Sequence, residues 1–135
     1  MKIEKLAVFG SRTIDDARVD QAIREAIKTH KPKYIVTAQE PLGVCQRAQE
    51  MAREMGLPAI LHYKNPRYLT GMFERRSKAV LSDCDLCLFV HDGNSQGTIN
   101  EMKIADKLGT PKKYVLIPVI EAKGGFTWDD LNFDL

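Results

Sequence analysis

The sequence lacks any apolar run long enough to cross a membrane, because a spanning helix needs about 20 consecutive apolar residues and its apolar runs are of strand length. It also shows no secretory signal at its start, since Met1 to Lys5 leads directly into a short apolar segment without a cleavage site. We therefore expect a cytoplasmic protein with no membrane partner.

An excess of charge of one sign is also missing. The chain has 20 basic and 18 acidic residues, for a formal net charge of +2, and they are spread along its length. Binding to the phosphate backbone of nucleic acids usually requires a basic block. We expect no nucleic-acid partner.

Cysteine is scarce, with three in the chain. Cys84 and Cys87 form a C-x-x-C pair, but a structural zinc site needs four ligands and there is no second pair. The two cysteines flank and enter the apolar run Leu86 to Val90, so we interpret them as reduced, small, buried side chains. We expect no metal and no cofactor.

A chain of 135 residues with 44% hydrophobic residues can bury one continuous core. Five short runs rich in β-branched and aromatic residues predict strands. Their continuous apolarity is typical of parallel strands covered on both faces. The runs are Leu6 to Phe9, Tyr34 to Val36, Ala59 to Leu61, Leu86 to Val90 and Tyr114 to Ile117.

Apolar residues at helical spacing separate these runs, and each series predicts one buried stripe. Gly56 with Pro58 and Gly109 with Pro111 mark a helix end before the next strand. The helical series are Val19, Ala22, Ile23, Ala26 and Ile27; Ala48, Met51, Ala52 and Met55; and Ile104, Ala105 and Leu108.

This alternation predicts an α/β, Rossmann-like fold over residues 1–120, with an open, mainly parallel five-stranded sheet, helices on both faces and strand order 3-2-1-4-5. Ligands of such sheets bind outside the carboxyl ends of the strands. Residues 121–135 interleave aromatic residues with acids, so we expect this tail to pack on the domain or on a partner subunit.

Gly10, Ser11, Arg12 and Thr13 directly follow the first predicted strand. Here glycine allows close backbone approach, serine and helix amides can donate to phosphate oxygens, and arginine offers a charged fork. The alternative is a plain turn in which Thr13 or Asp15 caps the next helix and Arg12 is solvated.

A second turn-rich loop follows the strand that ends at Val90. It contains Gly93 and leads through Ser95, Gln96, Gly97 and Thr98 into a helix, whose first free amides can cradle a phosphate. The alternative is that Thr98 and Glu101 form a capping box. Capping and chemistry stay equally open for Glu101.

Arg75 and Arg76 lie in the helix before that strand. Arginines on a helix are most often solvated, so these two residues alone indicate little.

Taken together, Val8 to Arg12, Arg76, Asp85 and the Gly93-x-Ser95-x-Gly97-Thr98 series resemble the SLOG superfamily of Rossmann-like nucleotide-binding domains. The resemblance covers about residues 5–118 and is nearest to the small stand-alone SLOG proteins. The superfamily includes the LOG phosphoribohydrolases, whose arginine and Gly-Thr-x-x-Glu signatures have counterparts here in Arg76 and Gly97 to Glu101.

Two departures from the family pattern are visible. The loop from His91 to Thr98 is two residues longer than in the LOG enzymes. After the second strand only Gly43 is clearly retained, while Ala38 replaces a glycine and Cys45 stands where relatives have a ligand-contacting aspartate.

The resemblance leads us to expect binding of a phosphate-bearing nucleotide or nucleotide-derived small molecule, as a sensor, carrier or sequestering domain. The predicted binding residues are Gly10, Ser11, Arg12, Gly43, Gly93, Ser95, Gly97 and Thr98. The alternative is an N-glycosidic bond hydrolase or a deoxyribosyltransferase-like enzyme, with Glu101 and Arg76 as catalytic residues. The resemblance and the aromatic tail also predict a homodimer or higher homo-oligomer.

Overall fold

The computed structural model describes residues 2–68 and 70–119, in which five strands alternate with four helices. The predicted tail at 121–135 lies outside the described residues. The elements in chain order are β1 (Lys5–Gly10), α1 (Ala17–His30), β2 (Tyr34–Ala38), α2 (Gly43–Glu54), β3 (Ala59–His62), α3 (Met72–Ser82), β4 (Leu86–His91), α4 (Gln96–Leu108) and β5 (Lys112–Leu116).

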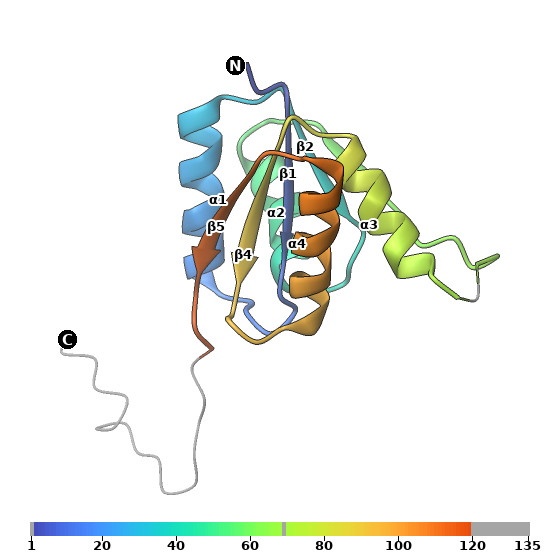
Figure 1. Cartoon of the computed structure of the whole chain (residues 1–135). Coiled ribbons are helices and arrows are strands. Elements are labelled where there is room, and N and C mark those ends of the chain that lie inside the picture. Colours follow the sequence, from blue (N-terminus) through green and yellow to red (C-terminus); the bar gives the residue numbers. More distant parts are fainter. Residues whose placement is uncertain (1, 69, 120–135) are drawn as a thin grey trace, which may run out of the picture.

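The five strands form one parallel sheet in the order β3-β2-β1-β4-β5, which confirms the predicted fold class and strand order (Figure 1). Leu6 of the central strand β1 pairs with Ile35 of β2 on one side and with Leu86 of β4 on the other. Strand order reverses between β1 and β4, and crevices for ligands form at such points.

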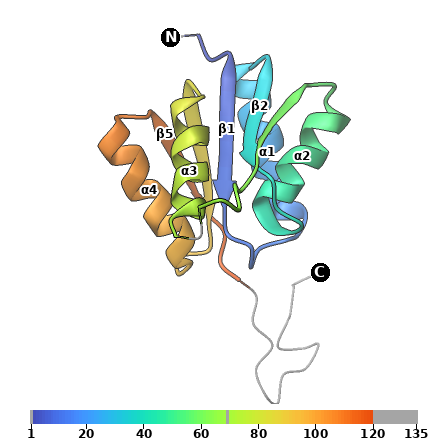
Figure 2. The same ribbon diagram turned by 90° about the vertical axis from the view of Figure 1, so that its right-hand side faces the viewer.

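Helices cover both faces of the sheet (Figures 1 and 2). On one face α1 and α2 pack over a core that includes Val8, Ile23 and Ala48. On the other face α3 and α4 pack over a core that includes Phe9 and Phe89. The continuous apolar runs of the central strands are explained by this double cover.

Helix ends follow local chemistry. Helix α1 begins at Ala17 because the Asp16 carboxylate accepts a hydrogen bond of 2.9 Å from the amide of Arg18. The N-cap is therefore neither Thr13 nor Asp15, the two residues considered in the alternative of a plain turn. The predicted glycine stops are confirmed, since Gly56 and Gly109 have φ values of 70° and 72° just after α2 and α4.

The edge strand β5 differs from its prediction. It begins at Lys112 instead of Tyr114, and its side chains are not covered on both faces, because Tyr114 and Leu116 are 50% and 65% exposed. An edge strand has a neighbour on only one side, so its side chains are less covered than those of the central strands. Leu108, predicted as part of a buried stripe, is likewise exposed.

Cys87 lies in the core, Cys84 is partly buried, and all three cysteines are free thiols. Among residues 2–68 and 70–119, no cluster of three or more histidine, cysteine, aspartate or glutamate side chains is arranged to hold a metal ion. In the same ranges, no helix has the length and apolar character that crossing a membrane would require.

Candidate functional site

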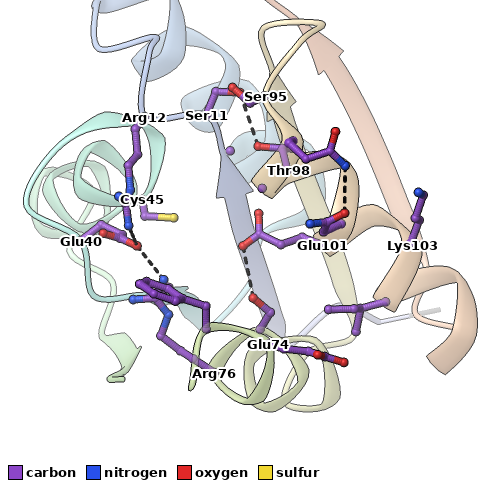
Figure 3. Close-up of a pocket in the computed structure, with 18 of the residues that line it drawn as sticks. Ser11, Arg12, Glu40, Cys45, Glu74, Arg76, Ser95, Thr98, Glu101 and Lys103 are labelled. Carbon is purple, nitrogen blue, oxygen red and sulfur yellow. Dashed lines mark hydrogen bonds and ion pairs between the residues drawn. The ribbon is translucent and has the colours of Figure 1, made fainter. Parts of the chain in front are cut away.

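A cavity of about 840 Å³ opens at the carboxyl ends of the central strands, between the loops after β1 and β4 and the helices α3 and α4. Figure 3 shows Ser11 and Ser95 at one end of it and Glu74 and Arg76 of α3 at the other, with Glu101 between them. The predicted site residues that line the cavity are Gly10, Ser11, Arg12, Arg76, Ser95, Gly97, Thr98 and Glu101. The predicted Gly43 and Gly93 do not line it.

Gly10 ends β1 where β4 and α2 come closest to it. A Cβ atom at this position would lie 2.3 Å from the carbonyl oxygen of Val90 and 2.6 Å from the Val44 side chain. Any side chain here would push these elements apart. Because Gly10 has no side chain, β1, β4 and α2 can pack closely next to the cavity.

Ser11 joins the two loops of the crevice. Its Oγ accepts a hydrogen bond of 3.2 Å from the amide of Asp92 and lies 3.4 Å from Oγ1 of Thr98. Ser11 and Thr98 are both buried, with exposures of 1% and 3%. Their hydroxyls therefore bind each other and the backbone, while the surface they present to the cavity is small.

Gly43 lies behind the β1 loop. Its φ of 79° is in the left-handed region, and a Cβ there would lie 2.6 Å from Cα of Arg12. The amide of Val44 donates a 3.3 Å hydrogen bond to the carbonyl of Ser11. Gly43 therefore supports the loop that carries Arg12, and Gly93, with a φ of 96°, lies in the turn before α4.

Asp92 fixes the β4 loop. Its carboxylate accepts hydrogen bonds of 2.8 and 2.7 Å from the amides of Asn94 and Ser95, one of 2.7 Å from Oγ of Ser95, and one from the hydroxyl of Thr13. Burial alone would raise the pKa of Asp92, but these donors outweigh burial and hold the pKa well below its ordinary value. The loop before α4 is thus tied to the loop after β1.

The amino end of α4 points into the cavity. Its first intrahelical bond runs from the amide of Ile99 to the carbonyl of Ser95, at 3.1 Å, and no side chain caps the Ser95 position. The amides of Gln96, Gly97 and Thr98 precede that bond, so no carbonyl of an earlier helical turn faces them. These donors and the helix dipole favour an anion at this point.

Thr98 and Glu101 do not form the capping box that the sequence left open as an alternative. Helix α4 starts at Gln96, three residues before the start at Ile99 that a box at Thr98 requires, because Asp92 and Ser95 already organise its entry. Thr98 therefore lies inside the first turn, and Glu101 lies too far along the helix to reach a capping position.

Glu101 instead projects into the cavity, where Oγ of Ser77 donates a 3.3 Å hydrogen bond to its carboxyl group (Figure 3). Burial is the main cause that raises its pKa to about 8, and the nearby charge of Glu40 adds to the effect. Ser77 and Arg76 act in the opposite direction without cancelling it. At neutral pH Glu101 therefore holds a proton and can donate a hydrogen bond.

Two arginines share one buried carboxylate at the side of the cavity (Figure 3). Nη2 of Arg12 and Nη2 of Arg76 lie 2.7 and 2.6 Å from the same Oε1 atom of Glu40, and Nη1 of Arg76 donates to the carbonyl of Gln39. Burial alone would raise the pKa of Glu40, but the two guanidinium groups hold it below its ordinary value. Arg12 is therefore ion-paired, although more than half of its side chain stays exposed to solvent.

Arg76 is 6% exposed although it lies on a helix, and its Nε atom has no hydrogen-bond partner among the described residues. A buried donor without a partner costs free energy. Its neighbour Arg75 lies on the exposed side of α3, where its guanidinium stacks on Tyr68 at 4.0 Å from the ring centroid. Only Arg76 thus belongs to the site.

Cys45 lines the cavity. Burial raises the pKa of its thiol to about 11, so the thiol stays protonated and uncharged at neutral pH. The position therefore contributes a small polarisable surface instead of a carboxylate.

Several lining residues were not predicted from the sequence, above all Glu40, Ser77 and Phe73. For Ser77 and Phe73 a signal was available, because they share helical spacing with Arg76, Val80 and Leu81 and so lie on the inner face of α3. For Glu40 no local signal exists, because its role depends on two arginines from distant segments.

The charges of the site sum in favour of an anion. Arg12, Arg76, Lys103 and Lys107 carry four positive charges against the two negative charges of Glu40 and Glu74, and Glu101 is neutral below about pH 8. The positive end of α4 adds to this balance. The arrangement can bind a phosphate group and can donate hydrogen bonds to a polar ligand.

A search of the sequence against models of known protein families found no match, and a search against curated proteins found none either. The residues of the cavity themselves therefore carry the functional argument.

Proposed function

We propose that this chain binds a phosphate-bearing nucleotide or nucleotide-derived molecule in the cavity, as a domain of the SLOG superfamily. The observation that carries the proposal is the unpartnered Nε of buried Arg76, which lines the same cavity as the free amino end of α4. Both features are hydrogen-bond donors held in place without an acceptor, and phosphate oxygens are suited to both.

The two donor sets suit different parts of such a ligand. The amides of Gln96, Gly97 and Thr98 favour the phosphate itself, because helix amino ends bind anions through backbone N–H groups. Arg12 and Arg76 flank the cavity from the β1 loop and from α3 and can bind further oxygens. The volume of about 840 Å³ lies within the range of small-molecule sites.

The position of Glu101 inside the cavity supports an enzymatic alternative. A carboxyl group inside the cavity, and not at a helix cap, is what cleavage or transfer of an N-glycosidic bond would use. Stabilising a cationic transition state requires the ionised form, whereas burial keeps Glu101 protonated at neutral pH. This favours a binding domain over a hydrolase.

The binding proposal is tested by replacing Arg12 with alanine. Arg12 is 55% exposed, so we expect the R12A variant to stay folded and to lose about tenfold or more in affinity, since a charge-assisted hydrogen bond contributes about 1.5–3 kcal/mol. Calorimetric titration with the four nucleoside 5′-monophosphates measures the change. R53A, which removes an exposed arginine of α2 outside the cavity, is the matched control and should bind as the wild type does.

The enzymatic alternative is tested with E101Q. Chromatography of nucleoside monophosphates incubated with each protein detects released base. If wild-type protein releases base and E101Q, shown to be folded by a cooperative melting transition, is slower by about a hundredfold, Glu101 is catalytic. We expect no release by either form, which leaves the binding function.

A further inference from the structure

The inner face of α3 continues past the sheet. Val80 and Leu81 pack in the core, Ser77 and Arg76 come one turn earlier, and Phe73 comes one turn earlier again at the same helical spacing. Because this first turn of α3 lies beside the carboxyl ends of the strands, its inner face meets the cavity and not the sheet. Phe73 thus occupies a core-type position that has no core to pack on.

Phe73 is accordingly 46% exposed although it lines the cavity. Leu42, just before α2, also lines the cavity and is 44% exposed. Two large apolar side chains therefore present open surface inside a site that also contains charged and polar groups. An apolar ligand group that covered them would gain free energy by removing this surface from water.

The surroundings of the Phe73 ring indicate what kind of group that is. The guanidinium carbon of Arg76 lies 5.4 Å and Nζ of Lys64 lies 4.9 Å from the ring centroid, within the range of cation–π contacts. Arg76 and Ser95, the residue before α4, lie at opposite ends of the cavity (Figure 3). A flat aromatic group that carries an anionic group fits an aromatic ring at one end and free helix amides at the other.

We propose that Phe73 is the stacking surface for the base of the bound nucleotide, with Leu42 adding apolar contact and the phosphate lying at the amino end of α4. The inference rests on the proposed function and adds the chemical class of the second half of the ligand, a planar aromatic ring. Tyr63 and Tyr68 of the preceding loop are also exposed, but they do not line the cavity.

The experiment compares two probes, the nucleoside 5′-monophosphates and ribose 5-phosphate, which has the sugar and phosphate but no base. We expect F73A to weaken binding of the monophosphate by about tenfold or more, the effect typical of losing one base–aromatic stack, and to leave binding of ribose 5-phosphate unchanged. F73W, which keeps an aromatic face, should retain affinity for the monophosphate. Y63A removes a nearby exposed aromatic ring outside the cavity and should change neither affinity.

The outcomes separate the base site from the phosphate site. If wild type binds the monophosphate and F73A binds it equally well, the base does not lie on Phe73. If F73A loses both probes to the same extent, Phe73 acts through Arg76 and the stacking assignment is wrong. If wild type, R12A and R53A all show no binding of either probe, the proposed function itself is wrong.

Discussion

The pKa of Glu101 is determined by the groups around it in the cavity. It lies in the cavity beside Ser77 and close to both Arg76 and Glu40, and burial is strong enough to raise its pKa to about 8 despite the arginine. In the unfolded chain the same group titrates near its ordinary value of 4.5. The folded protein therefore holds one proton more than the unfolded chain between these two pH values.

The additional proton on the folded protein leads us to expect that the difference in unfolding free energy between wild type and E101Q depends on pH. A pKa raised by folding gives stability that is fully present below about pH 4.5 and is lost as pH rises through about 8. Glutamine does not titrate, so the free energy of unfolding of E101Q relative to wild type should rise between pH 5 and 8. Because Glu101 is not fully buried, we expect a relative gain of about 1–3 kcal/mol, measured by urea unfolding at several pH values.

E25Q is the matched control, since Glu25 is exposed on α1 outside the cavity. Its unfolding free energy should follow wild type across the same pH range. If the difference in unfolding free energy between E101Q and wild type is the same from pH 5 to 8, Glu101 is ionised in the folded protein at neutral pH. Protonation of Glu101 would then no longer speak against hydrolysis.

At the residue scale, the sequence predicted which side chains line the cavity better than it predicted their contacts. Gly10, Arg12 and Thr98 were placed by their position after a strand, which the fold class determines. That Glu40 joins Arg12 to Arg76 could not be predicted, because three side chains from separate loops and helices meet only in the folded chain. The burial of Arg76 is predictable from its helical spacing to the buried residue Val80 of α3.

At the scale of elements, the entry to α4 decides what the cavity offers a ligand. Asp92 accepts hydrogen bonds from Thr13, Asn94 and Ser95 and so leaves the next three amides without a side-chain cap. From the sequence, a capping box of Thr98 and Glu101 stayed an open alternative, and it would have started the helix at Ile99. A local pattern was overridden here by a carboxylate that reaches the same turn from the strand end.

We predict that D92N destabilises the protein. Asparagine keeps one acceptor oxygen but turns an NH₂ group toward donors, so we expect a loss of about 1–3 kcal/mol in the free energy of unfolding at neutral pH. Because folding lowers the pKa of Asp92, its stabilisation is present above about pH 4 and is lost at lower pH. The difference in unfolding free energy between wild type and D92N should therefore decrease below about pH 4.

Urea unfolding at pH 7 and below pH 4 checks this prediction. D16N is the control, since asparagine caps a helix about as well as aspartate and should cost little at the start of α1. Equal stability of D92N and wild type at pH 7 would show that the β4 loop does not depend on this carboxylate.

At the scale of the whole molecule, strand order was predictable while exposure at the sheet edge was not. Alternating strands and helices with right-handed crossovers leave few arrangements, and β3-β2-β1-β4-β5 is one of them. The runs Leu6 to Phe9 and Leu86 to Val90 were recognisable because both faces are covered. The apolar run in β5 looks the same in sequence, but β5 lies at the edge of the sheet. A single apolar run does not show which elements will lie beside it in the folded chain.

Self-association stays a prediction from the sequence. Tyr114, Leu116 and Val119 are exposed on and just after β5, which gives a second copy an apolar surface to cover. We expect sedimentation velocity at micromolar concentration to give the mass of a dimer, with and without a nucleoside monophosphate. A monomer in both conditions would mean that the cavity, as lined by one chain, is the complete site.

The close approach of Gly43 to Arg12 restricts how this protein can vary. With a positive φ and 2.6 Å between its missing Cβ and Cα of Arg12, position 43 accepts a side chain only if the β1 loop withdraws. Withdrawal would also shift Ser11, and through it the contacts to Asp92 and Thr98. A new ligand preference in a descendant of this protein is therefore expected to arise at residues that face the cavity freely, such as Phe73 and Leu42, while the loop backbones beneath them are inherited as one unit.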